Sequence, residues 1–385
     1  MKTVLRYISA FFTILTLIIP LLTQGFAQHG RDIRAQRERL ETLEAQYASG
    51  AFPFADEASI VDGDLVSALE NGARFDDLSY IATHNSYQTH SVPAWARMST
   101  ALSQVIPDII PDGTGTLDHE TLTNQLNAGI RSFELDVVAA SKAGKPYFYC
   151  MHSPVIDMTT SCNDFALALR EVRLWSEHHP AHLPVTIILE PKLWFVPMEN
   201  LRFFSLQYAN ALDVFLREHL GDTLLEPADM LRDYVSFADM RQADDWLPVR
   251  DMLGKVLVLF HHDWLDDGAV INAYMRQDET FRTQAMFPLH IDSTLPNACF
   301  LVYNEPQTVQ EMRDTLSRGH FIVRTRTDAH PIRSDARRDL ALSCGAQILS
   351  TDYPPRFSSD ADNPVSFPNG KTVQIRFDNP KECAQ

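Results

Sequence analysis

The chain has 385 residues, of which 45% are hydrophobic and 10% aromatic, so it holds ample material for a buried core. Its formal net charge of −17 argues against nucleic acid and against electrostatic capture by an anionic membrane, because both require a basic surface. The length is large for one ordinary domain but suits a single α/β barrel with additional segments.

Residues 1–27 have the pattern of a secretory signal peptide. Lys2 and Arg6 precede an apolar run, and small residues lead up to Ala27. We expect cleavage after Ala27 and a secreted or periplasmic protein. The alternative is an uncleaved anchor helix, although the apolar stretch is short for a membrane span and contains Pro20.

Export would place the five cysteines in an oxidising compartment, where disulfides persist. Cys150 and Cys162 bracket one short loop and are the natural pair, whereas a bond between Cys299 and Cys344 is a weaker inference. An odd count leaves one cysteine over, and Cys383 stands alone near the end of the chain. Buried free thiols are the alternative for all of them, since no CxxC spacing indicates a thiolate metal site.

The order of elements predicts the fold class. A charged, helix-prone stretch after residue 30 indicates a helical extension, and from about residue 77 short β-branched runs alternate with helical patterns. The predicted strands are residues 78–84, 130–138, 146–152, 184–190, 255–262, 299–304, 320–328 and 346–352. Eight strands close a TIM-type (β/α)8 barrel, with one irregularity where the second and third strands form a hairpin-like step.

Helical patterns separate most of these strands, and the tail is rich in turn residues. The predicted helices are residues 165–179, 198–220, 308–319 and 336–345. The tail wraps the outside or adds a small hairpin. The expected organisation is a signal peptide at 1–27, a helical extension at 28–74, the barrel at 75–357 and a C-terminal tail at 358–385.

Acidic side chains stand where parallel barrels carry their ligands, at the carboxyl ends of the strands. Glu134 and Asp136 are two residues apart on one strand, so they project to the same side among residues expected to be buried. With Glu190 and the amide oxygen of Asn85 they offer four oxygen ligands, the set that Ca²⁺ or Mg²⁺ prefers over zinc. A structural salt bridge is the alternative for each single acid.

His84 and His152 follow the first and third predicted strands and would face each other across that cation. Two imidazoles beside a phosphodiester can take a proton from the attacking hydroxyl, donate one to the leaving oxygen, or stabilise the charge at phosphorus. Lys192, Arg324 and Arg326 are candidates for contact with a phosphate. The alternatives are histidines hydrogen-bonded at strand ends, a solvated lysine and surface arginines.

The remaining polar strand ends carry weaker signals. Tyr353, directly after the last strand, is a further candidate for substrate contact. His261 and His262 follow the fifth strand and are expected to form a surface pair, with a transition-metal site as the alternative. No GxSxG motif occurs, so only proximity favours Ser86 as a nucleophile.

Four motifs stand in order at barrel-strand spacing: HNSY at 84–87, ELD at 134–136, MHSP at 151–154 and LEPK at 189–192. In these motifs the chain resembles the phospholipase C-like phosphodiesterases, and among them the calcium-dependent phosphoinositide phospholipase C group of secreted bacterial proteins. The resemblance covers residues from about 75 to 355. It implies that the four oxygen ligands named above hold Ca²⁺ and that the two histidines are the catalytic pair.

The resemblance also implies attack by the inositol 2-hydroxyl on phosphorus, which expels diacylglycerol and leaves a cyclic inositol phosphate that water opens. The expected partners are a phospholipid or other phosphodiester substrate and, transiently, a membrane surface, but no nucleic acid. The rival functions are a glycerophosphodiester phosphodiesterase, a sphingomyelinase D-like lipase and a catalytically silent calcium- or ligand-binding barrel. In the glycerophosphodiester family the first strand usually ends in histidine-arginine, whereas here it ends in His84 and Asn85.

Overall fold

Apolar and β-branched residues form ten short strands in the part of the chain that the structure describes, and eight of these strands lie parallel in a barrel. The computed structural model describes residues 2–53, 57–61, 63–89, 92–104, 117–152, 159–192, 200–263, 266–329, 332–359 and 361–376. The strands are β1 (Leu78–Thr83), β2 (Ser132–Lys142), β3 (Lys145–Cys150), β4 (Val185–Pro191), β5 (Val256–His261), β6 (Phe287–His290), β7 (Phe300–Val302), β8 (Ile322–Arg326), β9 (Ile348–Thr351) and β10 (Val373–Ile375).

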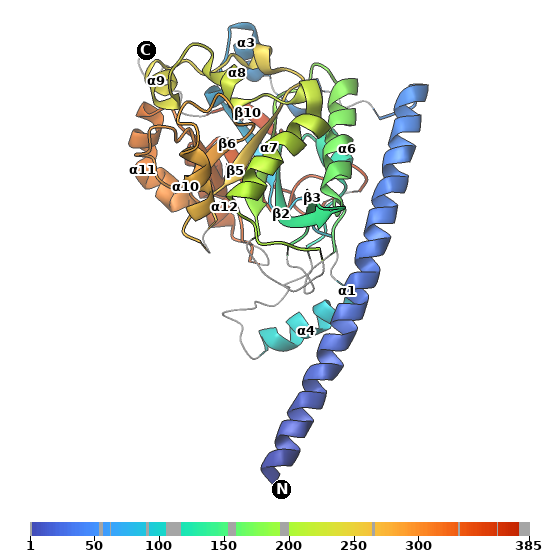
Figure 1. Ribbon diagram of the computed structural model, residues 1–385. Helices are drawn as coiled ribbons and strands as arrows, with labels where there is room; N and C mark the ends of the chain where they lie inside the picture. The colour runs from blue at the N-terminus through green and yellow to red at the C-terminus, as the bar shows by residue number, and fades with distance from the viewer. Residues whose placement is uncertain are drawn as a thin grey trace.

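Helices surround the barrel (Figure 1). They are α1 (Lys2–Ser49), α2 (Glu57–Ile60), α3 (Gly63–Glu70), α4 (Pro93–Ser103), α5 (Leu122–Asn127), α6 (Phe165–His178), α7 (Leu206–Leu220), α8 (Pro227–Leu231), α9 (Phe237–Gln242), α10 (Ala269–Met275), α11 (Pro306–Arg318) and α12 (Asp335–Ser343), with 3₁₀ turns at η1 (Phe75–Asp77), η2 (Gly221–Thr223) and η3 (Val249–Met252). Polar caps set several starts, as where the Asp164 carboxylate accepts a hydrogen bond from the backbone of Ala166 at the start of α6.

The barrel closes between β1 and β2 through a narrow seam. The strand order runs from β1 through β9, β8, β7, β6, β5 and β4 to β2, and β1 returns to β2 at one register position, Thr83 opposite Phe133. At the opposite end of β1, the tail strand β10 pairs antiparallel with Leu78 to Tyr80. The fold is therefore the predicted TIM-type (β/α)8 barrel, irregular at this seam, and the tail adds a strand to it.

The predicted third strand is real, but it does not belong to the barrel. β3 pairs with β2 in antiparallel orientation, with Cys150 opposite Val137, so the hairpin-like step is confirmed. The eighth barrel strand is instead β6, which sequence analysis missed. β6 is four residues long and contains Pro288, which weakens a strand pattern, whereas the longer alternating run of β3 imitates a barrel strand.

Helix α1 runs along the outside of the barrel. Followed back from its C-terminal end, it passes α6 and then α4, and its N-terminal end extends beyond the body (Figure 1). Its later half is bound by polar contacts: Gln36 donates to and accepts from the backbone of Asp164 at 2.9 Å, and Arg39 pairs with Glu171 at 2.8 Å. No helix in the described part of the chain is both long and apolar enough to cross a membrane.

Two further expectations differ from the structure. No disulfide joins the four cysteines that the structure describes, and each is a buried free thiol, so the pairing of Cys150 with Cys162 and of Cys299 with Cys344 is wrong. Cys383 lies outside the described residues. The helix predicted at 198–220 begins only at Leu206, because the backbone before it pairs with β2 through a bridge between Leu201 and Ala140.

Candidate active site

Three carboxylates meet where β2 passes the carboxyl end of β4. Glu134, Asp136 and Glu190 each offer an oxygen, and these atoms all lie within 4.8 Å of one another. Parallel pairing explains the meeting, because Asp136 stands directly opposite Glu190 across the two strands. Glu134 and Asp136 are buried, while the Glu190 side chain is 23% exposed and opens the cluster toward solvent.

The cluster carries more negative charge than its neighbours balance. Burial raises the pKa of Asp136 well above its ordinary value, Lys192 opposes this and Glu190 adds to it. Among the described residues, none donates a hydrogen bond to Asp136 Oδ1, although this oxygen is buried. A buried carboxylate oxygen without a partner is costly, and a hard cation would satisfy it. The residues present therefore fit Ca²⁺, and Glu134, Asp136 and Glu190 are the side chains that could hold it.

The HNSY motif forms the turn that leaves β1. Asn85 lies in the left-handed backbone region with φ of 48°, a conformation that asparagine tolerates better than most residues. The Tyr87 hydroxyl lies 2.6 Å from Asp136 Oδ2 and 3.3 Å from Asn85 Oδ1, so it holds the amide oxygen beside the carboxylates. Asn85 thus joins the predicted ligand set in space.

Ser86 joins β1 to β2 at the seam. Its backbone N–H donates to the carbonyl of Glu134 at 2.9 Å, and its Oγ accepts from the N–H of Glu134 at 2.8 Å. The hydroxyl is fully buried and also lies 2.6 Å from Thr83 Oγ1. This placement makes Ser86 a structural residue that positions Glu134 and the histidine before it.

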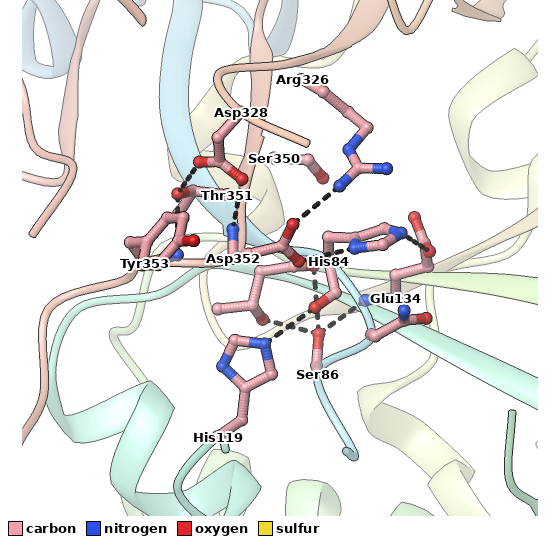
Figure 2. A network of polar contacts seen from close by, with 12 residues as sticks. His84, Ser86, His119, Glu134, Arg326, Asp328, Ser350, Thr351, Asp352 and Tyr353 are labelled. Carbon is pink, nitrogen blue, oxygen red and sulfur yellow. Dashed lines mark hydrogen bonds and ion pairs between the residues drawn. The ribbon is translucent and has the colours of Figure 1, made fainter. Parts of the chain in front are cut away.

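His84 is held between two carboxylates, as Figure 2 shows. Its Nδ1 lies 2.6 Å from Asp352 Oδ1, and its Nε2 lies 3.4 Å from Glu134 Oε1. A carboxylate only accepts hydrogen bonds, so Nδ1 carries a proton and Nε2 faces the acidic cluster. Asp352 is fixed in turn by Arg326 at 2.7 Å and, through its own N–H, by Asp328 at 2.9 Å.

The predicted phosphate-binding cations pair with the acids of the site. Lys192 lies 2.9 Å from Asp136 and 2.5 Å from Glu190, and Arg324 donates to Glu134 at 2.5 Å. Burial would raise the pKa of Glu134, but the neighbouring His84 and Arg324 side chains outweigh it, so the pKa lies below its ordinary value. The alternatives of a solvated lysine and surface arginines are wrong for Lys192 and Arg324, since both are buried.

His152 reaches the same site from the opposite direction to the barrel strands. β2 runs past the rim, β3 returns along it, and the N–H of Met151 donates to the carbonyl of Asp136 at 3.1 Å. Desolvation within the site lowers the pKa of His152, and the neighbouring Lys192 and His84 lower it further. The side chain nevertheless remains exposed, so water moderates this shift.

Other candidates take different places. The Arg333 guanidinium carbon lies over the Tyr353 ring, 4.0 Å from the centre of that ring. Tyr353 lies on the Asp328 side of Asp352 (Figure 2). His261 and His262 are not a surface pair, because both are buried. His261 Nδ1 donates to the carbonyl of His262 at 2.6 Å. Burial lowers the pKa of His261, and the nearby Glu190 and Glu134 oppose this shift.

Sequence reasoning assigned no role to two residues of the site. Asp352 stands one position before the candidate Tyr353, at the end of the last barrel strand, and its position beside that strand end was the available signal. His119 lies outside any predicted element, and its Nε2 donates to the His84 carbonyl at 2.9 Å. Burial lowers the pKa of His119 to about 4, so a neutral imidazole supports the backbone of His84 at neutral pH.

The family model described as "Phosphoinositide phospholipase C, Ca2+-dependent" matches residues 73–147 and 140–377, which is well over half of the chain. None of the curated proteins matches the chain in sequence.

Two solved structures of one enzyme share the fold. A calcium-dependent phosphoinositol-specific phospholipase C from a Pseudomonas species, as a myoinositol complex, is 16% identical with a TM-score of 0.52, covering 83% of this chain and 99% of its own. Crystal form 1 of the apo Pseudomonas enzyme is 16% identical with a TM-score of 0.51, covering 84% of this chain and 100% of its own. A Ca²⁺-dependent phosphatidylinositol-specific phospholipase C from Streptomyces antibioticus is 16% identical with a TM-score of 0.48, covering 73% and 95%.

Proposed function

Because the chain belongs to the calcium-dependent phosphoinositide phospholipase C family, a family of phosphodiesterases, we propose that it cleaves phosphatidylinositol-type lipids into diacylglycerol and an inositol phosphate. The observation that carries this proposal is the placement of His84, oriented by Asp352, directly beside the carboxylate cluster. A general acid–base group next to a calcium site is what transfer at a phosphodiester requires.

Ca²⁺ held by Asn85, Glu134, Asp136 and Glu190 would polarise the phosphoryl group and lower the pKa of the inositol 2-hydroxyl. The chain's own cations have another task. Lys192 lies between Asp136 and Glu190, and Arg324 is paired with Glu134, so they reduce the repulsion among these acids and hold them in place. Both cations also lie close enough to the cluster to attract the phosphate of the substrate.

The proton transfers fall to the two histidines. Asp352 accepts the Nδ1 proton of His84, which aims Nε2 at the reacting oxygens and stabilises the positive ring when Nε2 gains a proton. His152, exposed at the mouth of the site, exchanges the second proton. One imidazole takes the proton of the 2-hydroxyl as it attacks phosphorus, and the other donates a proton to the departing glycerol oxygen. The product of this step is a cyclic inositol phosphate, which water opens through the reverse transfers.

Alanine variants assayed on two substrates test this mechanism and assign the roles. With phosphatidylinositol, His84→Ala and His152→Ala should each lower kcat by about 10²-fold or more. An inositol phosphate ester of p-nitrophenol needs no protonation of its leaving group, so the variant that lacks the general acid should recover most of its activity on this ester. Normal turnover of phosphatidylinositol by His152→Ala would contradict the paired mechanism.

A substrate panel separates this function from its rivals. Purified protein would be incubated with phosphatidylinositol, phosphatidylcholine, sphingomyelin and glycerophosphodiesters, each with calcium and with chelator, and products followed by phosphorus NMR. Cyclic inositol phosphate formed only with calcium supports the proposal. Glycerol phosphate would indicate a glycerophosphodiesterase, and no turnover of any substrate would indicate a silent binding barrel.

Export is part of the proposal and rests on the pattern of residues 1–27. Cleavage after Ala27 would leave in place the contacts that Gln36 and Arg39 of α1 make with the barrel. Transient contact of the barrel mouth with a lipid surface would then follow outside the cytoplasm. N-terminal sequencing of the protein released by expressing cells tests the cut, which should give Gln28 as the first residue.

A further inference from the structure

A second group of metal-ligating side chains lies at the other end of the barrel. Asp76 is in η1 directly before β1, His320 is in the turn between α11 and β8, and Asp244 is in the turn after α9. His84 follows the carboxyl end of β1, and Arg326 is the last residue of β8, whereas Asp76 and His320 stand just before these strands begin. This group therefore lies on the opposite face of the barrel from the carboxylate cluster. Figure 1 places α9 at the end of the body away from α4, which follows β1.

The three side chains have the spacing of metal ligands. His320 Nδ1 lies 2.9 Å from Asp244 Oδ1 and 3.6 Å from Asp76 Oδ2, and one ligand atom of each residue lies within 4.8 Å of the other two. Ligands about 2.0–2.2 Å from a tetrahedral zinc ion stand roughly 3.4 Å apart. Small side-chain movements would therefore seat an ion, which would replace the proton on Nδ1.

An unpartnered buried oxygen independently points to a cation. Asp76 is 3% exposed, and no described group donates a hydrogen bond to its Oδ1. Two arginines lie nearby, but neither donates a hydrogen bond to this oxygen. Arg74 lies 3.5 Å from Asp244 Oδ2 and is shared with Asp245. Arg376 is close enough to Asp76 and Asp244 to interact with their charges, and its buried Nε likewise lacks a hydrogen-bond partner within the described chain. Leaving a buried carboxylate oxygen unpaired is costly, and coordination would remove that cost.

We propose that Asp76, Asp244 and His320 form a second, structural metal site that binds Zn²⁺ or a similar transition-metal ion. One imidazole nitrogen and two carboxylate oxygens suit zinc, whereas the four oxygens at the catalytic end suit calcium. The side chains of Asp244 and His320 are 26% and 21% exposed, so an ion can enter and water can complete its coordination. The bound ion ties together the segments that begin β1 and β8 and end α9, and thereby stabilises the closed barrel.

Zinc binding to untagged, full-length protein tests this site. The protein would be stripped with chelator, saturated with Ca²⁺ to fill the catalytic end, and titrated with Zn²⁺ by calorimetry, with the bound metal counted by mass spectrometry. We expect one equivalent of zinc and a rise in Tm of about 3 °C. His320→Asn should lose both, and asparagine suits the left-handed backbone of that position, where φ is 48°.

Matched variants separate this site from the catalytic one. His219→Ala, which removes a half-buried histidine elsewhere, and Glu134→Gln, at the calcium end, should both keep the equivalent of zinc. Asp244→Asn gives a second variant should His320→Asn fail to fold, and it should lose zinc in the same way. Equal zinc stoichiometry in wild type and His320→Asn, or no zinc bound by wild type in the presence of calcium, would overturn the proposal.

Discussion

His84 and Asp352 are 268 residues apart in the sequence, yet Nδ1 of the one lies 2.6 Å from Oδ1 of the other. Pairing of β1 with β9 brings them together. Thr83 stands opposite Thr351, and His84 and Asp352 are the residues that directly follow these two. The Asp352 side chain is fully buried and is held by Arg326, so it orients the imidazole without moving itself.

Replacing Asp352 with asparagine should therefore lower kcat with little effect on KM. The variant keeps the shape of the side chain but no longer stabilises a positive ring at His84, and we expect a loss of about 10²- to 10³-fold. Steady-state kinetics across pH measure this, because the orienting role also shifts the pH profile. Tyr353→Phe is the matched control next to it and should behave as wild type. A variant that alters KM alone would exclude the orienting role.

Replacing Asp136 with asparagine should weaken calcium binding by at least about 10-fold, since it removes one charged ligand from a site that depends on charge. Calorimetric titration with Ca²⁺ measures the affinity directly, and circular dichroism checks that the variant is folded. Asp244→Asn, which lies in the other acidic group, should bind calcium as wild type does. Unchanged affinity in Asp136→Asn would remove this residue from the calcium site.

The enzyme should prefer phosphatidylinositol to its phosphorylated derivatives. Lys192, Arg324 and Arg326 are each paired with a carboxylate of the site, and the chain as a whole carries a formal charge of −17. Additional ring phosphates would meet this negative field, so we expect kcat/KM for phosphatidylinositol bisphosphate to be at least about 10-fold lower. Both lipids presented in the same mixed micelles give the comparison, and equal rates would contradict it.

Asp213, on α7, makes stability depend on pH away from the active site. It accepts hydrogen bonds from the Tyr274 hydroxyl at 2.7 Å and the Ala285 N–H at 3.0 Å. Burial raises the pKa of Asp213 to about 6, although these hydrogen bonds oppose the rise. Because the folded pKa lies above the unfolded one, the protonated carboxyl stabilises the fold below about pH 4. This contribution is lost as pH rises through about 6.

Asp213→Asn should therefore raise Tm at pH 8 and leave it nearly unchanged at pH 4. A shift of about two pH units corresponds to up to about 3 kcal/mol, or roughly 3 °C in a chain of this size. Thermal melts at both pH values measure the effect. Asp314→Asn, on the exposed face of α11, removes the same charge and should show no such gain. A gain in Tm that is equal at the two pH values would rule out this role for Asp213.

Contiguous patterns predicted much of the fold and of the site. Seven of the eight barrel strands came from β-branched runs, and the predicted ligands Glu134 and Asp136 meet Glu190 as strand-end placement requires. These features are local, because the side-chain period of a strand and the polar residue at its end are written in neighbouring positions.

Tertiary structure alone decided the pairings. The membership of β6 rather than β3 in the barrel and the pairing of Asp352 with His84 depend on which strands lie side by side. The sequence by itself determined which residues stand at strand ends and carry charge. Closure of the barrel decided which of them meet, since it joins segments hundreds of residues apart and no local pattern records that distance.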